Sequence, residues 1–267
     1  MSTAVTSPWV PYPAPPAPAA QVTLYCLPHA GAGASGFLEW RRVLPPEISV
    51  VPLQPPGREM RFRDRPYDDV HPLVDDLLDA MAGQWRTPFA LFGHSMGALI
   101  AYELARRLCA EGHPRPVHLF VSGRRAPQVP AREPLIHEAD EAEFADVVRS
   151  LGGTPDQVLA DETLRANLFT LLRADFAVNE TYRYRPGPPL DLPVTVFGGT
   201  ADPKVAPSEL TGWRDCAAGP VGVRLVAGGH FFVVAQRASV LDHIARKLIR
   251  TEATRAEPLD CSRSATQ

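Results

Sequence analysis

The sequence has little of what marks secreted, metal-binding or nucleic-acid-binding proteins. Its 267 residues include only four cysteines, scattered without a Cys-x-x-Cys pair, so neither a disulfide framework nor a zinc site is predicted. The spacing His-Glu-x-x-His is also missing, and we expect no metal and no cofactor. A formal net charge of -3 provides no basic excess, which argues against a nucleic-acid partner.

Long apolar runs and a leader segment are missing as well. No stretch reaches the roughly 18 consecutive apolar residues of a membrane span. The N-terminus also lacks a basic segment followed by an apolar run. We therefore expect a cytoplasmic protein with no membrane partner.

Composition divides the chain into one domain and two tails. Residues 1–20 are rich in Pro and Ala, which predicts a flexible tail. Residues 21–250 carry the patterns of a folded domain, and their number is ample for one packed core. The polar residues 251–267 predict a second flexible tail.

Within the domain, short apolar segments typical of strands alternate with amphipathic segments typical of helices. The predicted strands are residues 22–27, 48–53, 89–92, 118–121, 192–197 and 221–226. This alternation predicts an α/β fold with a mainly parallel, doubly wound sheet and an active site at the carboxyl ends of the strands. Consecutive helical patterns interrupt it at about 133–185, which predicts an insertion that covers the site as a lid.

A Gly-x-Ser-x-Gly motif at residues 93–97 follows an apolar strand and precedes an amphipathic helix. This context predicts a tight turn that exposes the hydroxyl of Ser95 as a nucleophile. Gly93 and Gly97 lack side chains where the flanking segments must come close together. The helix that follows supplies backbone N–H groups and a partial positive charge.

A nucleophilic serine needs a base, and the base needs an acid that fixes its tautomer. In this type of fold the order along the chain is serine, acid, histidine. Among eight histidines, His230 is the one that comes after the serine and follows a strand through a Gly-Gly turn. Asp202, on the loop after the preceding strand, is the predicted acid. Asp175 lies in a helical pattern and remains the alternative acid, with a buried polar contact in the lid as its other possible role.

Residues 31–36 match Gly-x-Gly-x-x-Gly, which makes a dinucleotide-binding oxidoreductase an alternative of another class. Three residues, 28–30, separate the strand from the first glycine, and the next strand ends without the acidic residue that binds the ribose. We therefore interpret the loop as half of an oxyanion hole, with the backbone N–H groups of Ala30 and Met96 as donors.

Two charged segments lie outside these motifs. Residues 58–65 alternate in charge and have no apolar face, which predicts a solvated loop. Arg124 and Arg125 follow a predicted strand and either steer an acidic partner to the site or form internal ion pairs.

Together the motifs resemble those of type II thioesterases, the stand-alone editing hydrolases that accompany polyketide synthases and nonribosomal peptide synthetases. The resemblance spans about residues 22–250 and rests on segments 27–32, 54–59, 93–97, 122–127, 172–176, 198–202 and 229–232. It implies an α/β-hydrolase fold and hydrolysis of acyl groups from the phosphopantetheine arm of acyl- or peptidyl-carrier proteins in antibiotic biosynthesis. We expect the protein to be a monomer that uses Ser95, Asp202 and His230.

Three alternatives share this fold. A chain-terminating thioesterase is usually fused behind a carrier domain, whereas only a short Pro/Ala segment precedes this domain. A non-catalytic binding protein is expected to have lost a member of the triad, and Ser95, Asp202 and His230 are all present. A general carboxylesterase remains the strongest alternative, because the serine motif is common to many esterases.

Overall fold

The protein is described here by a computed structural model, in which residues 7–13, 18–130, 135–150 and 156–255 are placed. Six strands form one sheet in the order β2-β1-β3-β4-β5-β6, and every neighbouring pair is parallel. The strands are β1 (Val22–Leu27), β2 (Ile48–Pro52), β3 (Phe89–His94), β4 (His118–Ser122), β5 (Val194–Gly199) and β6 (Val221–Val226). The predicted α/β class with a parallel sheet is confirmed.

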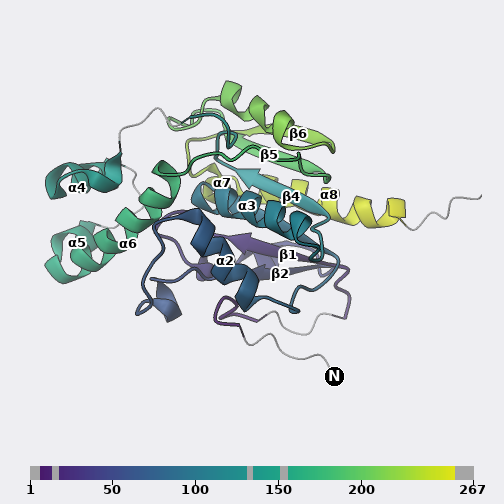
Figure 1. Cartoon of the computed structure of the whole chain (residues 1–267), viewed down its shortest axis with the longest axis horizontal. Helices are drawn as coiled ribbons and strands as arrows, with labels where there is room; N and C mark the ends of the chain where they lie inside the picture. Colours follow the sequence, from purple (N-terminus) through teal and green to yellow (C-terminus); the bar gives the residue numbers. More distant parts are fainter. Residues whose placement is uncertain (1–6, 14–17, 131–134, 151–155, 256–267) are drawn as a thin grey trace, which may run out of the picture.

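Helices cover both faces of the sheet (Figure 1). One face packs against α2 (Val70–Ala80) and α3 (Met96–Ala110), and the other against α1 (Trp40–Val43), α7 (Phe232–Ala235) and α8 (Arg237–Arg255). Successive strand residues point to opposite faces. Leu91 of β3 therefore joins one apolar layer and Phe92 joins the other. The inner strands β1, β3, β4 and β5 are buried along their whole length and are largely apolar, whereas the edge strand β6 is partly exposed.

The strand order reverses between β1 and β3, since β2 lies at one edge and β4 to β6 extend toward the other. In an open parallel sheet, the loops on the two sides of such a reversal diverge and leave a crevice at the carboxyl ends of the strands. The loop after β1 and the turn after β3 line this crevice. The sheet topology thus places the Gly-rich loop and Ser95 beside each other.

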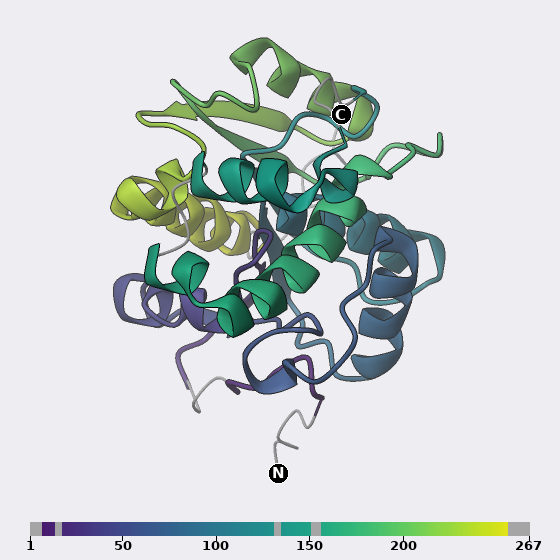
Figure 2. The ribbon, with the colours of Figure 1, turned by 90° about the vertical axis from the view of Figure 1, so that its left-hand side faces the viewer.

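Between β4 and β5 the chain forms η3 (Ile136–Glu138), α4 (Glu141–Ser150), α5 (Asp156–Ala160) and α6 (Glu162–Glu180). These helices lie beyond one end of the sheet in Figure 1 and in front of it in Figure 2. They share a small apolar cluster made of Phe144, Val148, Leu159, Phe169 and Leu172. The insertion lies where the lid was expected at 133–185, of which residues 133–134 and 151–155 lie outside the described part. Its mobility stays a prediction.

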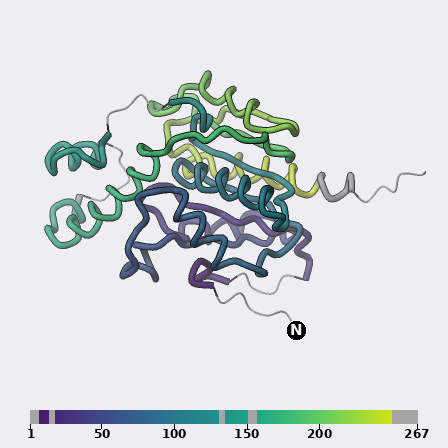
Figure 3. Tube along the Cα trace, viewed as in Figure 1, coloured from purple at the N-terminus to yellow at the C-terminus, as the bar shows by residue number. Residues whose placement is uncertain are grey.

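The N-terminal segment differs from the flexible tail expected for residues 1–20. Trp9 is fully buried, its Nε1 donates to Oδ2 of Asp76 at 2.9 Å, and its carbonyl oxygen accepts from the Gln54 N–H at 2.8 Å. Residues 7–13 therefore pack along the domain (Figure 3). Burial of one large aromatic side chain, worth about 2–3 kcal/mol, is the physical reason. Residues 1–6 and 14–17 lie outside the described part.

The helices α6 and α8 are the longest, with 19 residues each. The helix α8 continues past residue 250, where the domain was expected to end, and residues 256–267 lie outside the described part. Neither of these nor any other helix in the described ranges has the length and apolar composition needed to cross a bilayer.

Candidate active site

Ser95 lies in a strained turn between β3 and α3. Its φ of 53° and ψ of -112° are unusual for a residue with a side chain. A Cβ atom on Gly93 would lie 2.0 Å from the carbonyl oxygen of Gly97, and one on Gly97 would lie 2.2 Å from that of Leu27. Both contacts are too short for any side chain. The two glycines thus permit the close approach that the turn requires.

The structure brings the three predicted triad residues together. Nε2 of His230 lies 3.1 Å from Oγ of Ser95, and Nδ1 of His230 lies 2.9 Å from Oδ2 of Asp202. With Nδ1–H donating to the carboxylate, Nε2 is left to accept the proton of the serine hydroxyl. This arrangement is the geometry that activates a serine.

The acid and the base come from neighbouring strands. Asp202 follows β5 and His230 follows β6, and the two strands pair in parallel, so their carboxyl ends lie side by side. The side chain of Asp202 has no exposed surface, while that of His230 is 10% exposed. Oδ1 of Asp202 accepts the N–H of Lys204 at 2.9 Å. The carboxylate is therefore held by contacts at both oxygens.

Ala30 and Met96, the expected oxyanion donors, both lie beside the serine. Ala30 lines the same cavity as Ser95 and His230. Met96 is the first residue of α3, and N–H groups in the first turn of a helix have no partner within the helix. Both residues lie next to the nucleophile, and their role as oxyanion donors stays a prediction.

Side chains of other segments occupy the N–H groups of the Gly-rich loop. The carboxylate of Asp175 accepts the Gly31 N–H at 2.7 Å, and that of Glu59 accepts the Ser35 N–H at 3.3 Å. A dinucleotide would need such groups for its phosphates, and carboxylates already bound there repel phosphate. These contacts argue against the oxidoreductase alternative.

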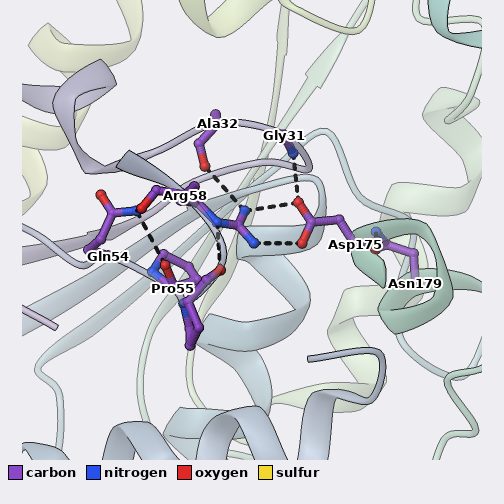
Figure 4. A network of polar contacts seen from close by, with 8 residues as sticks. Gly31, Ala32, Gln54, Pro55, Arg58, Asp175 and Asn179 are labelled. Carbon is purple, nitrogen blue, oxygen red and sulfur yellow. Dashed lines mark hydrogen bonds and ion pairs between the residues drawn. The ribbon is translucent and has the colours of Figure 1, made fainter. Parts of the chain in front are cut away.

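Asp175, the alternative acid, has a different partner from the one a triad needs. It forms a buried ion pair with Arg58, whose Nη2 lies 2.7 Å from its Oδ1 (Figure 4). Arg58 is only 5% exposed, so the solvated loop expected at 58–65 is wrong at its first residue. Sequence reasoning missed the pair because the two residues are 117 positions apart. A long-range contact of this kind leaves no local pattern.

Two further histidines, His29 and His94, lie near His230. Burial lowers the pKa of His29 to about 4, aided by the nearby charges of His230 and Arg58. Burial also lowers the pKa of His94 well below its ordinary value, and Nδ1 of His94 lies 3.0 Å from Oγ of Ser122. Both rings are therefore neutral at neutral pH, and it is His230 whose Nε2 lies within hydrogen-bond distance of Ser95.

Two cavities meet at Ser95 and His230. The smaller, of about 330 Å³, lies under the inserted helices and is lined largely by apolar side chains, including Val148, Leu168, Leu172 and Phe231. The larger, of about 830 Å³, is lined by several polar and basic side chains, including Arg124, Arg125, Gln128 and Arg183. The reactive serine thus lies where a smaller cavity, lined largely by apolar side chains, meets a larger cavity of mixed lining that includes basic side chains.

The two arginines singled out in the sequence make contacts within the protein. Arg124 donates to Oδ1 of Asn179 on α6, and Arg125 donates to the carbonyl oxygen of Lys204 at 3.2 Å. Both also line the larger cavity. Steering of an acidic partner by these residues stays a prediction. Within the described residues, no group of three His, Cys, Asp or Glu side chains could hold a metal ion.

Known proteins resemble this chain over most of its length. Residues 22–248 match the family described as "Thioesterase domain". The gramicidin S biosynthesis protein GrsT of Aneurinibacillus migulanus is 39% identical over 230 residues, or 86% of this chain and 90% of that protein. The thioesterase RedJ from the prodiginine pathway of Streptomyces coelicolor has a TM-score of 0.79 at 40% identity and covers 89% of this chain and 92% of its own.

A second solved structure gives the same result. The type II thioesterase BorB from the borrelidin biosynthetic cluster has a TM-score of 0.77 at 35% identity, covering 87% of this chain and 92% of its own. The matched family segment contains Ser95, Asp202 and His230. The resemblance to type II thioesterases found in the sequence is confirmed.

Proposed function

The chain belongs to the thioesterase domain family, and on that premise we propose that it hydrolyses acyl thioesters on the phosphopantetheine arm of carrier proteins. Its task is to remove aberrant or stalled acyl groups from a polyketide or nonribosomal peptide assembly line. The similarity to proteins from the gramicidin S, prodiginine and borrelidin systems supports this. We place the enzyme in the cytoplasm as a monomer, with acyl- or peptidyl-carrier proteins as partners.

One observation carries the proposal: the hydrogen-bonded chain Ser95–His230–Asp202 lies where a small, largely apolar cavity meets a larger cavity whose lining includes basic side chains. The phosphopantetheine arm is polar and the acyl group is apolar. A thioester carbonyl placed at Ser95 would have its acyl chain in the smaller cavity and its arm in the larger one. The two cavities thus match the two halves of such a substrate.

In the acylation half-reaction, Oγ of Ser95 attacks the thioester carbonyl carbon while Nε2 of His230 takes the hydroxyl proton. The carbonyl oxygen gains the negative charge, and the N–H groups of Ala30 and Met96 stabilise it. The C–S bond then breaks, and the departing sulfur takes the proton from His230. The products of this half-reaction are a free thiol on the arm and an acyl ester on Ser95.

In the second half-reaction, Nε2 of His230 takes a proton from water, and the resulting hydroxide attacks the ester carbonyl. The same backbone N–H groups hold the second oxyanion. The C–O bond to the serine breaks, and His230 returns the proton to Oγ of Ser95. The enzyme is restored, and the acyl group leaves as a carboxylic acid.

The test compares wild-type protein with Ser95→Ala on an acyl-carrier protein loaded with a short acyl chain. We expect the substitution to lower kcat by at least about 10³, because triad members act as one unit. Ser208→Ala, in the exposed part of η4 (Pro207–Cys216), serves as a matched control and should keep full activity. Retention of more than a few per cent of activity by Ser95→Ala would contradict the mechanism.

The same assay separates a carrier-directed thioesterase from a general carboxylesterase. A carboxylesterase would turn over a simple oxygen ester of the same acyl chain at least as well as the acyl-carrier protein. The larger cavity beside Ser95, with its basic side chains, supports the opposite expectation, a higher kcat/KM for the carrier-bound thioester. A preference for the oxygen ester would overturn the assignment of substrate while leaving the triad in place.

A further inference from the structure

A buried ion pair joins α6 to the segment that follows β2. Nη2 of Arg58 donates to Oδ1 of Asp175 at 2.7 Å, and Nη1 donates to Oδ2 at 2.9 Å. The side chains are 4% and 1% exposed. A guanidinium and a carboxylate joined by two parallel bonds have one preferred relative orientation. The pair therefore holds α6 and the segment after β2 in a defined position.

Both partners also bind the backbone of residues 30–36, here called the oxyanion loop. Oδ2 of Asp175 accepts the Gly31 N–H at 2.7 Å, and Nη1 of Arg58 donates to the Ala32 carbonyl oxygen at 3.2 Å (Figure 4). The Gly31 N–H belongs to the planar peptide unit that begins at Ala30. Fixing this unit restricts the backbone torsions at Ala30, and those torsions set the direction of the Ala30 N–H.

The segment after β2 holds the rest of the oxyanion loop. Oε1 of Gln54 accepts the Ala34 N–H at 2.9 Å, and the carboxylate of Glu59 accepts the Ser35 N–H at 3.3 Å. Nε2 of Gln54 donates in turn to the carbonyl oxygen of Arg58 at 3.3 Å. Residues 54–59 thus hold the loop through several hydrogen bonds, and α6 adds the contact from Asp175.

We propose that Arg58 and Asp175 are positioning residues for the oxyanion hole, through which the placement of α6 sets the direction of the Ala30 N–H. The inference rests on the proposed function, because it takes Ala30 as an oxyanion donor. An oxyanion donor stabilises the transition state more than the bound substrate, so its displacement lowers kcat and leaves KM nearly unchanged. A displacement of about 1 Å can cost about 10² in rate.

The same helix lines the smaller cavity beside Ser95, here called the acyl chamber. Leu172 and Phe176 of α6 face the cavity that contains Ser95, and Leu172 packs so closely on Gly31 that a Cβ there would lie 2.7 Å from its Cδ2. An acyl chain that fits the chamber leaves α6 in place, and Asp175 keeps the loop in position. A chain that displaces α6 moves Asp175 with it. Fit of the acyl chain and stabilisation of the oxyanion are thereby linked.

The test uses the double variant Arg58→Met with Asp175→Leu. Removing both charges leaves no unpaired charge in the interior, so we expect the fold to be retained, while the contacts to Gly31 and Ala32 are lost. The matched control is Glu103→Gln, which alters another ion pair with a buried carboxylate: the Glu103 side chain is 4% exposed and accepts from Arg106 at 3.2 Å. The readouts are melting temperature, kcat and KM for a small acyl thioester, and affinity for a trifluoromethyl ketone analogue. The Ser95 adduct of this ketone carries an oxyanion.

We expect the double variant to lose about 10- to 100-fold in kcat with KM within about threefold of wild type. Its affinity for the ketone should weaken by the same factor as kcat/KM. Glu103→Gln should change the melting temperature and leave kcat and ketone affinity unchanged. Wild-type kcat in the folded double variant would overturn the proposal, as would a loss of kcat with unchanged ketone affinity.

If circular dichroism shows that the double variant is unfolded, Arg58→Lys replaces it. Lysine keeps the charge opposite Asp175 but lacks the planar fork that reaches Ala32 as well. For Arg58→Lys as well, a wild-type kcat, or a loss of kcat with unchanged ketone affinity, would overturn the proposal. Failure of the proposed function has a different signature, since wild-type protein would show no Ser95-dependent hydrolysis of thioesters at all.

Discussion

Nδ1 of His230 lies 2.9 Å from Oδ2 of Asp202, and the side chain of Asp202 is fully enclosed by protein. In this setting the carboxylate decides which ring nitrogen carries the proton. It also stabilises the imidazolium that forms when the serine proton is transferred. The effect of this pair on catalysis can be measured with a substitution that keeps the shape of the Asp202 side chain.

Asp202→Asn should lower kcat by about 10⁴, because an amide NH₂ turned toward Nδ1 favours the wrong tautomer of His230. Asp175→Asn, a matched change at the other buried aspartate, should cost at most about 10², because Asp175 contacts Arg58 and Gly31 rather than the histidine. Steady-state rates with a small acyl thioester give both numbers. If the two losses were exchanged, the acid would have to be assigned to Asp175.

Gly97→Ala should destabilise the protein and abolish hydrolysis. The new Cβ would lie 2.2 Å from the carbonyl oxygen of Leu27, a backbone atom that can move only if α3 separates from β1. We expect a loss of about 3 kcal/mol in the free energy of unfolding, measured in urea. Gly36→Ala is the control, since no atom lies within 4 Å of its added Cβ. Equal stability of the two variants would contradict the close packing at the turn.

Acid should destabilise the protein partly through His118, whose Nε2 lies 2.9 Å from Oγ1 of Thr195 in the interior. Burial lowers the pKa of His118 from 6.5 to about 3, aided by Lys247 and His243. Below pH 6.5 the unfolded chain binds a proton that the folded protein does not bind until about pH 3, so the free energy of unfolding falls as pH falls through this window.

At pH 5 this single group should account for a loss on the order of 2 kcal/mol relative to pH 8. The measurement is urea unfolding of wild type and His118→Gln at both values. His29 and His94 titrate in both proteins, so the difference between the two pH dependences isolates His118. Parallel pH dependences would show that the pKa of His118 is not lowered in the folded protein.

Hydrogen exchange should be faster in α4 and α5 than in β3. These helices are held largely by the small cluster around Phe144 and Phe169, whereas Val178, near the end of α6, joins the main core. Mobile covering elements come from the least stable parts of a structure. We therefore expect slow exchange around Asp175 and Val178 and fast exchange in α4. Exchange in α4 as slow as in β3 would rule out an opening lid.

The nucleophile turn and the sheet could be predicted from the sequence because their determinants are local. A strand, two glycines around Ser95 and an amphipathic helix follow one another within a few residues. Chain order then restricted the base to His230 and made Asp202 the first choice of acid. Parallel strands bring such loops to one edge of the sheet without any knowledge of long-range contacts.

The support of the oxyanion loop could not be predicted in the same way. Arg58 begins a segment of alternating charge, and its burial depends on a carboxylate that arrives from α6, far along the chain. The position of Asp175 in a helical pattern indicated only a possible polar contact. The packing of α6 over the sheet determines that Asp175 pairs with Arg58. The sequence around either residue gives no indication of this contact.

The burial of Trp9 means that the unit that folds is longer than the segment shared with the family. The family match begins at residue 22, yet the indole of Trp9 fills part of the core beside α2 and satisfies Asp76. A shortened protein that begins at β1 would lack Trp9, which would leave a cavity beside α2 and expose apolar surface there. Boundaries drawn for recombinant shortening or domain exchange should therefore lie before residue 7 rather than at β1.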